Sequence, residues 1–170
     1  AFTAFGFFNY QFKGKNILFI ILLATMMIPS QVSIIGFYEL NRKLKLLNSF
    51  VPLIIPGIAS AGSVFFIRQY TESALSTSLL EAARIDGCGE FKIFHKIALP
   101  IMMPSIATMG IFSFVGNWNN YITPLILLNK PEKFTLPLAI ASLAGTTYKP
   151  DLGAQYLAVC ISIVPIMVAF

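Results

Sequence analysis

The side chains that could take part in chemistry concentrate between Ser78 and Pro100. This stretch brings acidic, basic and imidazole groups into one short interval: Glu81, Arg84, Asp86, Glu90, Lys92, His95 and Lys96. Such groups can act as acids and bases, ligate a metal, or form ion pairs with another protein. Because long apolar segments surround the stretch, we expect it to lie outside a bilayer, where a soluble partner could reach it.

Catalysis and metal binding are not favoured by the spacing of these groups. Glu81 and Asp86 could form a carboxylate pair, but no pocket is predicted around them. His95 is the single histidine and has no cluster of metal ligands beside it, which favours a solvated side chain. The chain also lacks the Gly-x-x-x-x-Gly-Lys-Ser/Thr phosphate loop. We therefore expect a protein that is not an enzyme and holds no cofactor or metal of its own.

The composition predicts a membrane protein. Hydrophobic residues make up 56% of the chain and charged residues 11%, against roughly 25% charged in an average soluble domain. The net charge of +5 is scattered over several loops, which gives no support for nucleic-acid binding. Cys88 and Cys160 are expected at different depths, so we expect no disulfide between them. The expected fold is an all-α, polytopic transmembrane helical bundle in the lipid bilayer, formed by one domain over residues 1–170.

Uncharged runs predict the helices that position the polar stretch, since a crossing helix needs about 20 apolar residues. The run after residue 97 is too long for one straight span, so we expect it to break near 116–121. The last apolar run stops without a flanking charge, and we expect the chain to be part of a longer one. The expected segments are a partial span at 1–12, a span at 16–38 kinked at Pro29, a surface helix at 39–45, a span at 46–67, a helix at about 100–116, a bent or re-entrant stretch at 122–128, an outer connection at 130–151 and a partial span at 152–170.

Three asparagines lie close to the hydrocarbon at this predicted break: Asn117, Asn119 and Asn120. Amide groups near lipid need hydrogen-bond partners, which makes these residues candidates for lining a polar translocation pathway. An interfacial loop explains them equally well, with Trp118 and Tyr121 as anchors at the membrane surface. The residues alone leave both alternatives open.

Within the polar stretch, the sequence predicts a short helix with a sharp end. Ser78 followed by Glu81 is a capping-box pattern, so we expect the helix to begin at Ser78. Ala82 and Ala83 favour helix and add little bulk, which would allow close approach of another protein surface. Gly87 stands where a left-handed cap would end the helix. A second helix should then lead to Pro100, since proline is tolerated best in a first helical turn.

The spacing of this stretch resembles a known motif. Glu-Ala-Ala, three residues, Gly, nine residues and Ile-x-Leu-Pro occur at Glu81, Ala82, Ala83, Gly87, Ile97, Leu99 and Pro100. This is similar to the EAA loop of binding-protein-dependent ABC importer permeases, and Asp86 lies within it. Other segments resemble the sugar-importing, maltose-permease-like branch of that family: Ala24 to Pro29, Leu46 to Asn48, Asn117 to Asn119, Pro124 with Leu125, and Phe134 to Pro137.

The resemblance implies a MetI-like fold in a bacterial-type cytoplasmic membrane. It implies that the loop at about 71–100 is cytoplasmic and serves as a coupling helix docked on an ABC ATPase subunit, which would hold ATP and Mg. It further implies a second, different permease subunit and an extracytoplasmic solute-binding protein. The branch implies a carbohydrate as the imported solute.

An ion- or proton-coupled secondary transporter is the alternative that the sequence leaves. Such a protein would be expected to carry ionisable residues inside its spans. The predicted complete spans contain none, which favours the ATP-driven importer.

Overall fold

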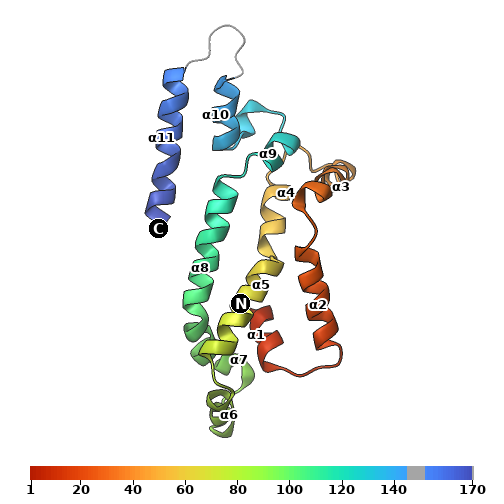
Figure 1. Ribbon diagram of the computed structural model, residues 1–170, viewed down its shortest axis with the longest axis vertical. Helices are drawn as coiled ribbons and strands as arrows, with labels where there is room; N and C mark the ends of the chain where they lie inside the picture. Colours follow the sequence, from red (N-terminus) through yellow and green to blue (C-terminus); the bar gives the residue numbers. More distant parts are fainter. Residues whose placement is uncertain (145–151, 170) are drawn as a thin grey trace. The chain divides into compact units, whose positions relative to one another are not determined.

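The computed structural model describes residues 1–144 and 152–169, and within these residues the regular structure is helical, with no strand (Figure 1). This confirms the all-α fold class. The elements are α1 (Phe2–Asn9), α2 (Lys15–Met26), α3 (Ser30–Lys43), α4 (Val51–Ile54), η1 (Ile55–Ile58), α5 (Ala61–Ala74), α6 (Thr77–Ile85), α7 (Glu90–Ile93), η2 (Phe94–Ala98), α8 (Leu99–Trp118), α9 (Ile122–Leu127), η3 (Pro131–Lys133), α10 (Leu136–Ala144) and α11 (Leu152–Ala169).

Three helical stretches of the described part are long and apolar enough to cross a membrane: Val51–Ala74, Glu90–Trp118 and Leu152–Ala169. α2 and α3 pass the same test when they are taken together as one broken span. The predicted break after α8 is present, because the helix ends at Trp118 and α9 begins at Ile122. Residues 145–151 of the predicted outer connection lie outside the described residues.

Two predicted spans are interrupted. α2 ends at Met26 and α3 begins at Ser30, where Pro29 has no N–H for a helical hydrogen bond. α3 then continues to Lys43, so the predicted separate surface helix at 39–45 is wrong. The predicted span at 46–67 consists of α4 and η1, an extended link at Ala59 and Ser60, and α5.

α5 runs past the predicted end of that span as far as Ala74. Arg68 lies in this extension, where two neighbouring side chains contact its guanidinium. Its guanidinium carbon lies 4.3 Å from the ring centroid of Phe19, and its Nη2 pairs with Glu72 one turn further on. A charged residue is thus accommodated inside the helix rather than at its end.

The described residues group into two compact units. The first comprises Ala1–Pro29 and Ser60–Gly110, and the second comprises Ser30–Ala59 and Ile111–Phe170. In the first unit α1 packs against α5, and the buried core includes Phe5, Leu80, Ile93 and Met102. In the second unit, Asn48 binds the end of α9, since its backbone N–H donates to the Leu127 carbonyl at 2.8 Å. The single domain over 1–170 stays a prediction.

Candidate functional site

The short helix of the polar stretch is α6, and it begins before the predicted residue. Ser76 is the N-cap, and its Oγ accepts a hydrogen bond from the backbone N–H of Leu79 at 3.3 Å. Ser78 lies inside the first turn, with its Oγ 2.9 Å from Ser76 Oγ. The predicted capping box of Ser78 with Glu81 is therefore wrong.

Apolar contacts explain why the helix begins at Ser76. Leu75 precedes the cap and Leu80 follows it within the first turns, and both are buried in the core of the first unit. This pairing is a hydrophobic staple, which fixes the direction of the chain as it enters the helix. The pair of leucines was visible in the sequence and could have identified the correct cap. Full burial of a side chain such as Leu80 is worth about 2 kcal/mol.

α6 has one buried face and one exposed face. Leu80 and Ala83 point into the core, at 0% and 7% exposure. Glu81, Ala82 and Asp86 are exposed. Leu79 and Ile85 are exposed as well, and Ile85 retains 87% of its accessible surface. The outer face therefore leaves the apolar side chains of Leu79 and Ile85 exposed beside two carboxylates.

Gly87 ends α6 in the predicted left-handed conformation, with φ of +77°. The Cys88 N–H donates to the Ala83 carbonyl at 2.9 Å, and the Gly87 N–H donates to the Arg84 carbonyl at 3.0 Å. These two bonds form a Schellman motif, which satisfies carbonyls that the helix end leaves without partners. Gly89, by contrast, has φ of −69° and serves as the N-cap of α7 without a side-chain bond.

The chain re-enters helix at Glu90 and remains helical to Trp118. Ile97 lies in the π-helical turn η2, half-buried against the core, and Leu99 and Pro100 begin α8. The N–H of Leu99 donates to the Phe94 carbonyl, a bond one residue longer than in an α-helix. As expected, Leu99 and Pro100 lead into the long helix α8, and the helical turns before them leave no break. Pro100 lies within a continuous helix, and the wider turn before it relieves the clash that its ring would make.

A polar network joins α6 to α1 and α7, and the sequence reasoning missed it. Arg84 Nε donates to Glu90 Oε1 at 2.7 Å, and Arg84 Nη2 donates to Asn9 Oδ1 at 3.0 Å. The Tyr10 hydroxyl donates to Glu90 Oε2 at 2.6 Å. Hydrogen bonding to Glu90 raises the pKa of the Arg84 guanidinium and of the Tyr10 hydroxyl above their usual values. Both groups therefore keep their protons at physiological pH.

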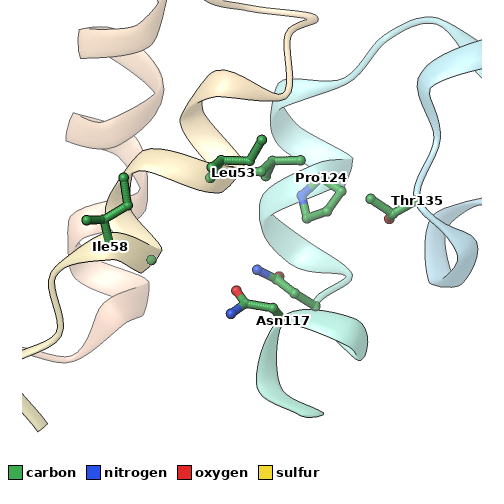
Figure 2. Close-up of a pocket in the computed structure, with 8 residues that line it drawn as sticks. Leu53, Ile58, Asn117, Pro124 and Thr135 are labelled. Carbon is green, nitrogen blue, oxygen red and sulfur yellow. The ribbon is translucent and has the colours of Figure 1, made fainter. Parts of the chain in front are cut away.

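The three candidate pathway residues do not share one environment. Asn117 and Asn120 line a cavity of about 400 Å³ in the second unit, and Asn119 does not. Figure 2 shows Leu53 and Ile58 across the cavity from Asn117 and Pro124. Thr135 also lines it, and its buried hydroxyl oxygen has no hydrogen-bond partner among the described residues. The other lining residues are Ile54 and Gly57.

Local bonds hold the two cavity asparagines. The Asn117 side-chain amide donates to the Ser113 carbonyl at 2.8 Å, and Asn120 Oδ1 accepts from the Thr123 backbone N–H at 3.3 Å. Trp118 faces a different neighbour, because its indole N–H donates to the Ser162 carbonyl of α11 at 3.0 Å. The cavity therefore presents a few polar groups on a largely apolar wall, which is typical of small-molecule sites.

Comparison with known families agrees with the motif. Residues 1–170 match the family described as "Binding-protein-dependent transport system inner membrane component". The chain belongs to this family. The three helical stretches of the described residues that are long and apolar enough to cross a membrane agree with that membership. The family description together with these helices places this permease-family chain in the inner, cytoplasmic membrane.

The relatives of this permease-family chain include transporters named for sugars. It is 40% identical over 161 residues to the arabinooligosaccharides transport system permease protein AraQ of Halalkalibacterium halodurans, covering 95% of this chain and 57% of that protein. It is 32% identical to the lactose transport system permease protein LacG of Rhizobium radiobacter, covering 99% of this chain and 61% of that protein. The chain thus spans less than two thirds of the length of these relatives.

A solved structure shows the same arrangement of helices. The permease-family chain aligns with a TM-score of 0.81 and 25% identity to a chain from the crystal structure of a bacterial ABC transporter involved in the import of the acidic polysaccharide alginate. The alignment covers 97% of this chain and 62% of the other. The MetI-like, all-α permease fold expected from the sequence is confirmed.

Residues that could bind a metal do not gather in the described part of this permease-family chain. There, no three His, Cys, Asp or Glu side chains come together. His95 is exposed on η2, and Cys88 and Cys160 are both free thiols.

Proposed function

We propose that this chain is a permease subunit of a binding-protein-dependent ABC importer that carries a small carbohydrate across the cytoplasmic membrane. Family membership over the full chain supports the permease role, and the sugar-transport names of its relatives support the substrate class. The observation that carries the proposal is the short helix α6, whose exposed face projects from the first unit between two apolar helices.

In this proposal α6 is the coupling helix. Its exposed residues Glu81, Ala82 and Asp86 meet an ABC ATPase subunit, which holds ATP and Mg. Gly87 ends the helix, and the segment through Ile97, Leu99 and Pro100 carries its movement into α8. Because α7, η2 and α8 form one continuous helix, a displacement at Glu90 reaches the membrane without an intervening loop.

The chain acts together with further subunits. A second, different permease subunit completes the translocation pathway, and an extracytoplasmic solute-binding protein delivers the sugar. Asn117 and Asn120 line that pathway, because their amide groups can bond to sugar hydroxyls while the apolar wall meets the C–H face of the ring. Asn119 lies outside the cavity and contributes no contact.

The coupling role is tested with the complete permease, assembled with its ATPase, its partner permease and its binding protein in proteoliposomes. Replacing Ala82 with Trp places a large side chain on the exposed face, so the ATPase should no longer co-purify and ATP-dependent sugar uptake should be lost. Ala74→Trp is the matched control, because Ala74 is also an exposed alanine but lies on α5. Normal uptake by the Ala82→Trp variant would refute the docking role of α6.

The pathway role is tested by comparing two asparagines of the same segment. Asn117→Leu removes an amide from the cavity and should raise the sugar concentration needed for half-maximal uptake. Asn119→Leu removes an amide outside the cavity and should leave uptake unchanged. Equal effects of the two substitutions would rule out the cavity as part of the pathway.

A further inference from the structure

The orientation of α6 depends on side chains, because its covalent connections are short and not helical. Leu75 and Ser76 are extended before the helix, and residues 86–89 form a turn after it. The buried faces of Leu80 and Ala83 hold α6 against the core. Apolar burial is not directional, however. Directional contacts therefore add to this burial in keeping α6 from turning on its two connections.

Four residues supply such contacts, and we call them the α6 clasp: Asn9, Tyr10, Arg84 and Glu90. The Arg84 guanidinium reaches both oxygens of Glu90, through Nε at 2.7 Å and Nη2 at 3.4 Å. Arg84 Nη2 also donates to Asn9 Oδ1 at 3.0 Å. Glu90 Oε2 accepts from the Tyr10 hydroxyl at 2.6 Å and from Asn9 Nδ2 at 3.5 Å.

The clasp joins three helices at their ends. Asn9 is the last residue of α1 and Tyr10 its C-cap, Arg84 lies in the last turn of α6, and Glu90 is the first residue of α7. A cation near the C-terminus of a helix and an anion near the N-terminus are each favoured by the helix dipole. Each charged partner therefore stands at the helix end that stabilises it, and the bidentate guanidinium geometry fixes the angle between the two helices.

We infer that Arg84 and Glu90 are positioning residues for coupling, which fasten α6 to α1 and α7 so that these helices move as one body. This inference rests on the proposed function. When the ATPase displaces α6, the clasp passes the movement to α1 directly, alongside the covalent route through α7. Without it, α6 turns on its connections and part of the displacement is lost.

The expected effect is partial, because the clasp is solvent-accessible. The side chains of Arg84 and Glu90 are 37% and 43% exposed, and exposed ion pairs change an equilibrium by no more than about fivefold. Arg84→Gln and Glu90→Gln should therefore each lower the solute imported per ATP hydrolysed by about twofold to fivefold. The amount of ATPase that co-purifies should stay unchanged, since neither substitution alters Glu81, Ala82 or Asp86, the residues proposed to meet the ATPase.

The test is the double variant Arg84→Glu with Glu90→Arg in the complete, reconstituted importer. It restores an ion pair of reversed polarity, and the neutral partners tolerate the exchange because an amide and a hydroxyl can each donate and accept. We expect the solute-to-ATP ratio of the double variant to exceed that of both single variants but to stay below that of the unmodified importer, because the exchanged charges stand at helix ends where the dipole disfavours them. Arg42→Gln is the control, since it removes an exposed ion pair of the same kind in α3, with 2.9 Å between Arg42 and Glu39.

Three results would overturn the inference. The first is an unchanged solute-to-ATP ratio in both single variants, and the second is a ratio in the double variant that does not exceed that of the single variants. The third is a loss of co-purified ATPase at an unchanged ratio, which would show a role in assembly only. If the unmodified importer itself shows no ATP-dependent uptake, the proposed function fails. If it transports and the single variants match it, only the clasp fails.

Discussion

The left-handed cap at Gly87 gives the sharpest prediction. The backbone conformation there is unusual, whereas the space for a side chain is open. Its φ of +77° lies in the left-handed region, and a Cβ added there would meet no atom within 4 Å. A substitution is therefore limited by conformation and not by collision. For an L-residue other than glycine the left-handed conformation costs roughly 1–2 kcal/mol. Gly87→Ala should thus lower the ratio of the native to the opened turn by about 5- to 30-fold.

A series of side chains at this position tests that cause. Asparagine tolerates the left-handed region better than alanine although it is larger, and a β-branched residue tolerates it worst. We therefore expect Gly87→Asn to disturb the turn least, Gly87→Ala more and Gly87→Val most. The assay is backbone hydrogen exchange over α6 in the purified permease, compared with solute imported per ATP in the reconstituted importer.

An order that follows side-chain size would refute this reasoning. If alanine were tolerated best and asparagine and valine were equally harmful, space rather than φ would limit the position, and a partner surface would lie against Gly87. Gly89→Ala is the matched control, because Gly89 has φ of −69° and ψ of 154°, which any residue adopts. No neighbouring atom lies within 4 Å of its added Cβ, so this variant should leave both measurements unchanged.

Three further outcomes are expected. Ser76→Ala should destabilise α6 by about 1 kcal/mol and speed hydrogen exchange of its first turn, whereas Ser78→Ala should have a smaller effect; the reverse order would restore Ser78 as the cap. Trp118→Phe removes the N–H that Ser162 accepts and should lower the free energy of unfolding by about 1 kcal/mol, measured by thermal unfolding in detergent. Thr135→Val replaces a buried hydroxyl that has no partner in the described part of the chain with an apolar group, so it should leave the melting temperature unchanged or raise it, and a clear loss of stability would show that the hydroxyl is satisfied.

The features that could be predicted from the sequence are those decided by neighbouring residues. Gly87 adopts the left-handed cap because few other residues reach that conformation. The end of α8 near Trp118 follows from the polar residues beside it. The EAA spacing identified the family because a motif is a local pattern. In each case the deciding interactions lie within a few positions along the chain.

The features that could not be predicted depend on residues far apart in the sequence. Asn9 and Tyr10 are about eighty positions from Glu90, and no local pattern connects an uncharged aromatic segment to a distant carboxylate. The cavity wall likewise brings Leu53 and Ile58 to Asn117, residues that the sequence assigns to separate spans. The choice of Ser76 over Ser78 as the N-cap of α6 falls between these two cases. Both serines can cap a helix locally, and the burial of Leu75 and Leu80 in the core decides between them.

Contacts that are local in sequence and contacts that are distant in sequence have separate roles in α6. The ends of α6 are marked by the Ser76 cap at one side and the Gly87 turn at the other, and the burial of Leu80 and Ala83 stabilises a helix too short to be stable alone. Its direction is set by contacts that are distant in sequence, namely the buried core and the clasp to α1. A substitution at Gly87 should therefore damage the helix itself, whereas one at Arg84 should leave the helix intact and change only where its movement goes. Hydrogen exchange over α6 separates these two cases, because it should rise in the first variant and stay unchanged in the second.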